Sequence, residues 1–240
     1  MTGQDALLAA IREKDWKKTE FVAKTNPLMM GWSLFDFYED SEGTKTETAF
    51  MPHHIVVQHP DAAVSLIHTF SKIFPDGFSK PDSHYKRMPL HLACMNGCSP
   101  DLILELIAID IKGKEDATQR AMNTADALGR LPIHYACKHK HLKPAIEKFI
   151  ELNPESLKCA DVGGFLPAHV ACRFGQPVAL CKLMVFKAPE TVSWKTQKGN
   201  TCSMLASKYI EDEERKRQVV AVLERFAYTD SLLRGKGLRK

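Results

Sequence analysis

The 240-residue sequence lacks long apolar runs. Its apolar runs, such as residues 102–104, cover only a few positions, whereas a helix needs roughly 20 apolar residues to cross a bilayer. A membrane span is therefore not expected. The N-terminal segment also lacks the continuous apolar core and small-residue cleavage site of a secretory signal. We expect a cytoplasmic protein, with the nucleus as the alternative compartment.

Glycine and proline, at 13 residues each, are too few for a collagen-like or low-complexity chain. With 44% hydrophobic and 26% charged residues, the chain has the composition of a globular protein. It contains seven cysteines, and an odd number without framework-like spacings favours reduced thiols. The net charge of +4 is too small to indicate a nucleic-acid-binding protein by itself.

An internal repeat organises the sequence. The pattern apolar-Pro-x-His-x-Ala-Cys occurs at residues 88–94, 131–137 and 166–172. A weaker copy at residues 51–54 keeps the proline and a following histidine, and another at residues 201–206 keeps only the alanine and a threonine. Self-similarity of this kind indicates a repeat architecture.

Each copy predicts a pair of short antiparallel helices. Proline at the first helical position has a suitable φ and lacks only an N–H that has no partner there. Pro100, Pro144 and Pro177 start a second helix by the same rule. The alanine of the pattern lets the next unit approach closely, and the cysteine beside it acts as a compact apolar filler.

The pattern resembles the ankyrin repeat, a unit of about 33 residues with the signature Thr-Pro-Leu-His-x-Ala. Apolar residues replace the signature threonine in the three strong copies. The resemblance implies an all-α fold, an ankyrin-repeat solenoid of about six helix-turn-helix units with capping ends. It would occupy residues 1–228, with units starting near residues 5, 52, 89, 132, 167 and 202, and residues 229–240 would form a basic C-terminal tail.

The repeated histidines and cysteines raise the question of a metal site. Each His-x-x-Cys pair, such as His91 with Cys94, shares one helical face. However, tetrahedral zinc needs four converging ligands, and stacked helices about 8–10 Å apart would spread the pairs along the array. The ankyrin resemblance instead implies histidines that bond to the turn backbone and cysteines in the core. We expect no metal.

Motifs of catalysis are also missing. The sequence has no phosphate-binding loop, no nucleophile elbow and no zinc-protease motif. We therefore expect no catalytic residues, no cofactor and no enzymatic activity. The ankyrin resemblance implies a protein-interaction module instead, with the role of an adaptor, scaffold or inhibitor, and we expect the protein to be monomeric on its own.

The concave side of such an array is formed by the loop tips and the exposed part of each first helix. At the positions expected there, basic and aromatic residues predominate and acidic residues are missing from the third unit onward. We predict that this face binds an acidic protein or peptide; the alternatives are a basic groove for nucleic acid and cations that only maintain solubility. The predicted contact residues are Tyr85, Arg87, Met95, Asn96, Arg130, Lys138, His139, Phe165, Arg173, Phe174, Lys208 and Tyr209.

A long connection precedes the second unit. Residues 29–50 contain Trp32, Phe35, Phe37 and Tyr38 followed by several acidic residues. Long loops in compact arrays are often functional. The aromatic cluster is interpreted either as a recognition element or as local packing against the first units.

Overall fold

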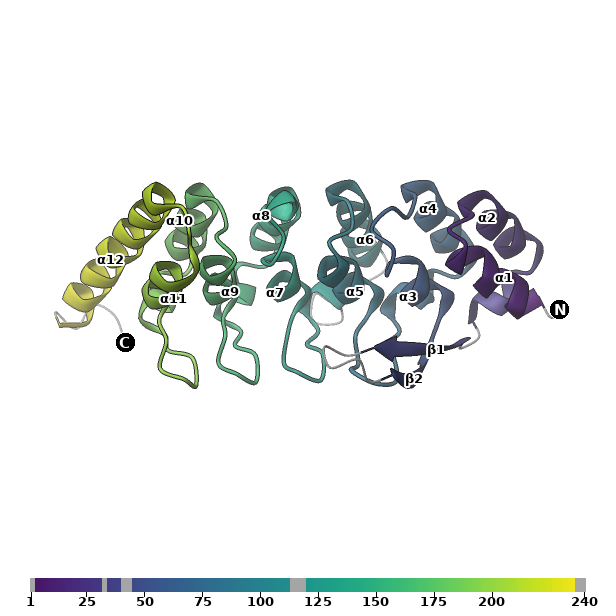
Figure 1. The fold of residues 1–240 in the computed structure, drawn as a ribbon, viewed down its shortest axis with the longest axis horizontal. Coiled ribbons are helices and arrows are strands. Elements are labelled where there is room, and N and C mark those ends of the chain that lie inside the picture. Colours follow the sequence, from purple (N-terminus) through teal and green to yellow (C-terminus); the bar gives the residue numbers. More distant parts are fainter. Residues whose placement is uncertain (1–2, 32–33, 40–44, 113–119, 236–240) are drawn as a thin grey trace. The chain divides into compact units, whose positions relative to one another are not determined.

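The computed structural model describes residues 3–31, 34–39, 45–112 and 120–235. The chain divides into two compact units, unit 1 at residues 1–127 and unit 2 at residues 128–240. Both are built mainly from short paired helices, so the all-α repeat fold predicted from the sequence is confirmed for the helical part (Figure 1).

The described part of unit 1 contains three pairs of helices. Short 3-10 turns follow the second helix of each pair, and the second helices α2, α4 and α6 pack side by side. The core between these layers is apolar and includes Leu66, Phe70, Leu102 and Ile103, all with at most 1% of their surface exposed. The helices are α1 (Gly3–Arg12), α2 (Trp16–Thr25), α3 (Pro52–Val56), α4 (Val64–Ile73), α5 (Pro89–Asn96) and α6 (Pro100–Lys112), and the 3-10 turns are η1 (Pro27–Gly31), η2 (Pro75–Ser79) and η4 (Ala121–Asn123).

Unit 1 also contains a β-hairpin that the sequence analysis did not predict. Strand β1 (Leu34–Glu39) pairs antiparallel with β2 (Lys45–Phe50), in a register that sets Leu34 opposite Phe50 and Glu39 opposite Lys45. The hairpin lies within the long connection between the first two helix pairs. The prediction for the aromatic side chains of residues 32–38 falls outside the described side chains and stays a prediction.

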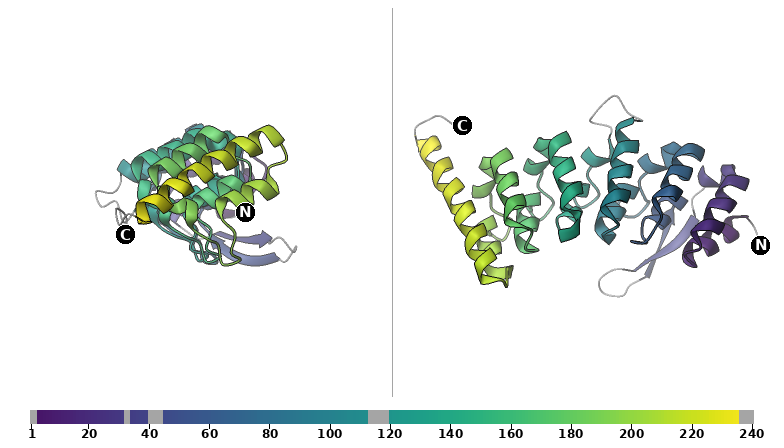
Figure 2. Two further views of the ribbon diagram at one scale, coloured as in Figure 1. Left: turned by 90° about the vertical axis from the view of Figure 1, so that its left-hand side faces the viewer. Right: turned by 90° about the horizontal axis from the view of Figure 1, so that it is seen from above.

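Unit 2 repeats the helix pair in a regular form. The first helices form one layer and the second helices the next, and the loops extend from the other side of the first layer (Figure 1). In Figure 2 the second helices lie side by side within this unit. The elements are α7 (Pro132–Ala136), η5 (Lys140–Leu142), α8 (Lys143–Leu152), η6 (Pro154–Lys158), α9 (Pro167–Arg173), α10 (Val178–Lys187), η7 (Pro189–Ser193), α11 (Cys202–Tyr209) and α12 (Glu213–Gly235).

The starts of the first helices follow the sequence pattern. Pro132 and Pro167 occupy the first turn of α7 and α9 after a residue with extended backbone. This is the position where proline costs no backbone hydrogen bond. Helix α11 has no such proline. There Thr201 serves as the N-cap, and its Oγ1 accepts a hydrogen bond from the Met204 N–H at 3.3 Å.

The alanine and cysteine of the pattern lie where adjacent first helices pack. In α9 and α11, which contact one another, Ala171, Cys172, Cys202 and Ala206 are all at most 1% exposed. Small residues here allow the two helices to approach closely. All seven cysteines are free thiols, and six of them are buried.

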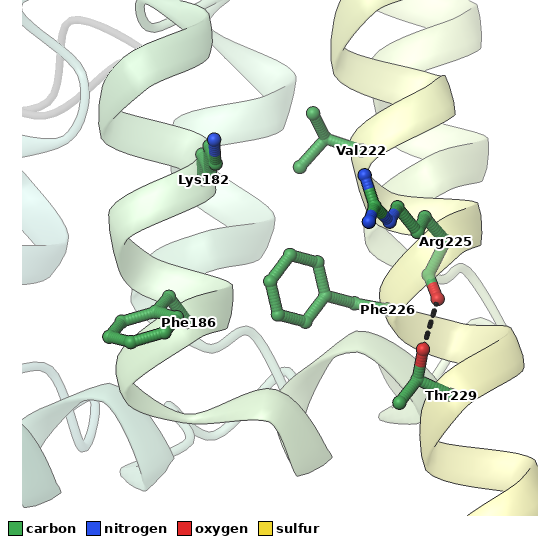
Figure 3. A pocket seen from close by; sticks show the side chains of 6 residues that line it. All are labelled: Lys182, Phe186, Val222, Arg225, Phe226 and Thr229. Atoms are coloured by element: carbon green, nitrogen blue, oxygen red, sulfur yellow. Dashed lines mark hydrogen bonds between the residues drawn. The ribbon is translucent and has the colours of Figure 1, made fainter.

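Helix α12 corrects the predicted end of the array. The array was expected to end at residue 228, but the helix continues to Gly235. Asp230 anchors this extension because it is buried and its Oδ2 accepts a hydrogen bond from Ser193 Oγ at 3.4 Å. Nearer its start, α12 packs on α10, and Phe226 points toward that helix (Figure 3). Residues 236–240 of the predicted basic tail lie outside the described residues.

Glycines allow neighbouring loops of unit 2 to stack. Gly164 has a φ of +76°, and a Cβ added there would lie 2.9 Å from the backbone nitrogen of Gln197 in the next loop. That same nitrogen donates a hydrogen bond to the Gly163 carbonyl at 3.0 Å. Both the left-handed backbone and the close approach of the next loop therefore require glycine at position 164.

Replacing Gly164 by Ala should destabilise the protein more than replacing Gly199 by Ala. Gly199 has nearly the same φ, +77°, but an added Cβ would meet no atom within 4 Å. Gly199→Ala should cost about 1–2 kcal/mol of unfolding free energy from backbone strain, and Gly164→Ala about 1–3 kcal/mol more from steric overlap. Urea unfolding of both variants measures the difference, and equal losses would contradict the proposed loop stacking.

Candidate functional site

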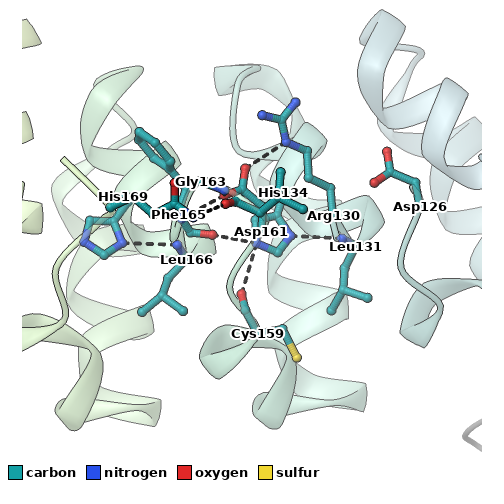
Figure 4. A network of polar contacts seen from close by, with 12 residues as sticks. Asp126, Arg130, Leu131, His134, Cys159, Asp161, Gly163, Phe165, Leu166 and His169 are labelled. Carbon is teal, nitrogen blue, oxygen red and sulfur yellow. Dashed lines mark hydrogen bonds and ion pairs between the residues drawn. The ribbon is translucent and has the colours of Figure 1, made fainter. Parts of the chain in front are cut away.

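Buried histidines connect the helix pairs of unit 2. The Nδ1 atom of His134 accepts a hydrogen bond from the Leu131 N–H at 3.1 Å, at the start of its own helix. The proton of the neutral ring must then be on Nε2. Nε2 donates to the carbonyls of Cys159 (3.1 Å) and Phe165 (3.2 Å) (Figure 4). Cys159 directly follows the turn η6, and Phe165 lies in the loop that leads to α9.

Two other histidines make the same connection. His169 accepts from the Leu166 N–H at 3.1 Å and donates to the Trp194 carbonyl at 3.1 Å. In unit 1, His54 accepts from the Met51 N–H at 3.1 Å and donates to the Lys80 carbonyl at 2.9 Å. The resemblance to ankyrin repeats implied this role. We use the name imidazole bridges for His54, His134 and His169.

Burial keeps the imidazole bridges neutral. It lowers the pKa of His54 to about 4, although Asp82 and the backbone carbonyls oppose the shift. Burial also lowers the pKa of His134 and of His169. Because both ring nitrogens of each bridge bond to backbone, these residues are committed to structure. Among the residues that the structure describes, no cluster of three or more His, Cys, Asp or Glu side chains is arranged to hold a metal ion.

An ion pair fixes the loop before α9. Arg130 Nε donates to Asp161 Oδ2 at 2.9 Å, and Asp161 Oδ1 accepts from the backbone N–H groups of Gly163 (2.8 Å) and Phe165 (2.9 Å) (Figure 4). The carboxylate is almost fully buried, whereas about a third of the Arg130 side chain is exposed. Burial lowers the pKa of Arg130, but hydrogen bonds to Asp161 and Tyr135 outweigh this effect and leave it raised.

A cavity of about 200 Å³ lies beside this ion pair, between α7 and α9 and the loops that precede them. Five of the predicted contact residues line it, together with three that were not predicted. The cavity thus combines three cations with two aromatic rings. The predicted residues are Arg130, Lys138, Phe165, Arg173 and Phe174, and the others are His134, Asp161 and Val170.

The same surface continues onto α11. The guanidinium carbon of Arg173 lies 5.2 Å from the centre of the Tyr209 ring and 5.9 Å from that of Phe174. Lys208 Nζ lies 5.2 Å from the Tyr209 ring centre. Phe174 and Tyr209 are each 41% exposed. The basic face of unit 2 is defined here as Arg130, Lys138, Phe165, Arg173, Phe174, Lys208 and Tyr209.

The prediction that Arg87 contributes to a surface is wrong. The residue is only 4% exposed, and its Nε contacts the fully buried Asp126 carboxylate at 3.3 Å. Its guanidinium carbon also lies 4.2 Å from the centre of the Tyr85 ring. Arg87 corresponds to Arg130 in the repeat, but its ion pair is completely buried and therefore holds the loop rather than a partner.

The other predicted residues lie outside the basic face. Tyr85, Met95 and Asn96 are half-buried in unit 1, and Asn96 Nδ2 donates to the Leu92 carbonyl at 2.9 Å, which closes the end of α5. His139 belongs to unit 2, but it does not line the cavity and its ring lies 5.7 Å from that of His141.

Sequence reasoning missed the acidic residues of the site. Asp161 lies in the cavity wall, and the spacing could have revealed it, because Asp126 and Asp161 both stand six residues before a pattern proline. Glu211 and Asp212 line a neighbouring cavity of about 240 Å³ that shares Phe174 and Tyr209 with the basic face. The basic face therefore borders a cavity of mixed charge, because Lys140 and Arg215 line that cavity as well.

The arrangement of the helices identifies the class of protein. Paired helices that stack through small buried residues and imidazole bridges are those of a helical repeat protein. Residues 90–194 match the family model for ankyrin repeats in three copies, and the chain is an ankyrin-repeat protein. No curated protein matches the sequence. Ankyrin repeats are generally modules for protein–protein interaction and are typically not catalytic.

No helix in the described part of the chain is both long and apolar enough to span a membrane.

The free energy of unfolding should fall as the pH falls below about 6.5. The pKa of His54 is lowered to about 4 in the folded protein, so the unfolded chain binds a proton that the folded chain does not. His54 alone should therefore cost up to about 1.4 kcal/mol per pH unit between pH 6.5 and 5. The lowered pKa values of His134 and His169 add to the loss in the same direction. Urea unfolding between pH 7.5 and 5 measures the slope.

A variant isolates one bridge in this experiment. His134→Gln removes one titrating group. The free energy of unfolding of this variant should therefore fall less steeply with decreasing pH than that of the native protein, by the contribution of one histidine. A free energy of unfolding that stays constant from pH 7.5 to 5 would contradict the neutral bridges.

Proposed function

We propose that the protein is a non-catalytic adaptor, scaffold or inhibitor whose basic face binds an acidic segment of a partner protein. The observation that carries this proposal is the cavity where Arg130, Lys138 and Arg173 surround Phe165 and Phe174. Arginine and aromatic residues are the types that dominate interface energetics. A segment with an apolar side chain flanked by carboxylates fits this combination.

The electrostatics of the basic face support an acidic partner. Arg173 and Lys208 form no ion pair with any other residue in the described ranges, so both charges are available to a carboxylate. Arg130 differs because Asp161 already neutralises it. We therefore assign partner capture chiefly to Arg173 and Lys208, and orientation of the loop to Arg130.

Two other interpretations fit the site less well. Cations that only maintain solubility would not need to lie against exposed aromatic rings, as Arg173 and Lys208 do. A nucleic-acid-binding role is not favoured by the sequence pI of about 8.6, since domains that bind nucleic acid usually have a pI above about 9. The free thiols are in keeping with a reducing compartment such as the cytoplasm.

Affinity capture tests the proposed function. The native protein and an Arg173→Glu/Lys208→Glu variant are compared as baits in a lysate of the expressing cells, with retained proteins quantified by mass spectrometry. The variant should lose about tenfold or more of the partners with acidic segments, because it places carboxylates opposite carboxylates. Nuclease treatment should leave the capture by the native protein unchanged.

A matched control distinguishes an effect of the basic face from an effect of the net charge of the protein. Lys187→Glu/Arg217→Glu makes the same change in net charge on the exposed surfaces of α10 and α12, and it should retain the partners. Equal capture by all three baits would overturn the assignment of the basic face. Loss of capture after nuclease treatment would indicate nucleic acid instead. Reversal of Arg130 is unsuitable, since it would leave Asp161 buried beside a second carboxylate.

A further inference from the structure

A second surface of unit 2 has the features of a docking groove. A cavity of about 410 Å³ lies between α10 and α12, on the layer of second helices and away from the basic face. Phe186 of α10 and Val222 and Phe226 of α12 form its apolar part (Figure 3). Phe186 is 65% exposed, and an exposed large aromatic ring within an apolar patch is typical of an interaction site.

Two cations flank the apolar part of this groove. Lys182 lies one turn before Phe186 on α10, and Arg225 lies beside Phe226 on α12. Both side chains are exposed, and neither forms an ion pair with a residue in the described part of the chain. None of the residues that line the groove is acidic. The groove is thus apolar in the middle and positive on both helices.

We propose that this groove binds an amphipathic acidic helix of a partner protein, independently of the basic face. An amphipathic helix can place apolar side chains at i and i+4 into a groove of this kind. Carboxylates on its two flanks would face Lys182 on one side and Arg225 on the other. This charge complementarity sets the partner apart from a neutral or basic helix.

The two helices that form the groove differ in length. Helix α10 has ten residues, whereas α12 has 23 and continues to Gly235. The last part of α12 therefore extends beyond the end of its neighbour. A partner helix in the groove would cover Phe186 and Phe226, which the repeat itself leaves partly uncovered.

Selection of displayed peptides tests the proposed groove. A library of 14-residue helices with random apolar and charged positions is selected on the native protein, and the enriched peptides are synthesised and titrated by fluorescence anisotropy. The expected peptides are apolar at i and i+4 with Asp or Glu on both flanks. Lys182→Glu/Arg225→Glu and Phe186→Ser should each weaken their binding by about tenfold or more.

Matched variants serve as controls for both changes. Lys187→Glu alters a charge of α10 that does not line the groove, and Tyr228→Ser removes a ring of α12 that is 68% exposed but also outside it. Both should retain the native affinity. The Arg173→Glu/Lys208→Glu variant should retain it too, so that failure of the basic face and failure of the groove can be told apart. Circular dichroism verifies that each variant is folded.

Other results would overturn this proposal. These are enrichment of basic or uncharged peptides, or binding that none of the groove variants weakens. If sedimentation shows a dimer that Phe186→Ser dissociates, the groove holds a second copy of the chain. Two results together would make the groove a site for small amphipathic anions. Decanoate would displace the selected peptides, and replacing the carboxylates of those peptides would not weaken their binding.

Discussion

The hydrogen bond between a neutral imidazole and the backbone of the connection that follows its helix pair is the constraint on which the repeats depend. His54, His134 and His169 each connect their own helix start to a carbonyl 25 or 26 residues further along the chain. Two short helices cannot bury their apolar sides alone, and this link fixes the connection that leads from each pair to its neighbour. Each bond contributes about 1 kcal/mol, and an unpaired buried ring nitrogen would cost more.

The same loops that the imidazoles hold also present the basic face. Phe165 belongs to the loop whose carbonyl accepts from His134, and its N–H is fixed by Asp161. The ion pair of Asp161 with Arg130 then orients a cation at the cavity wall. The positions of the side chains on the basic face therefore depend on buried polar groups as well as on the apolar core. A loop that is already fixed in this way loses little conformational entropy when a partner binds.

Much of this architecture could be predicted from the sequence because proline, histidine, alanine and cysteine act locally. The proline of the pattern begins a helix, as Pro132 and Pro167 do for α7 and α9. The prediction for Arg87 was wrong because its exposure depends on a carboxylate 39 residues away, and no helical period encodes that distance. The β-hairpin and the extension of α12 were missed for a similar reason, since backbone pairing and the contact of Asp230 with Ser193 are tertiary.

Proton-detected nitrogen NMR of the imidazole rings at pH 7 tests the central claim most directly. If the account is right, His54, His134 and His169 will each carry their proton on Nε2, with a bare Nδ1 that shows the shift of an acceptor, and His54 will remain neutral at pH 6. Protonation of Nδ1 in any of the three, or a charged His54 ring at pH 6, would contradict it, because the bond to the helix start would then be absent.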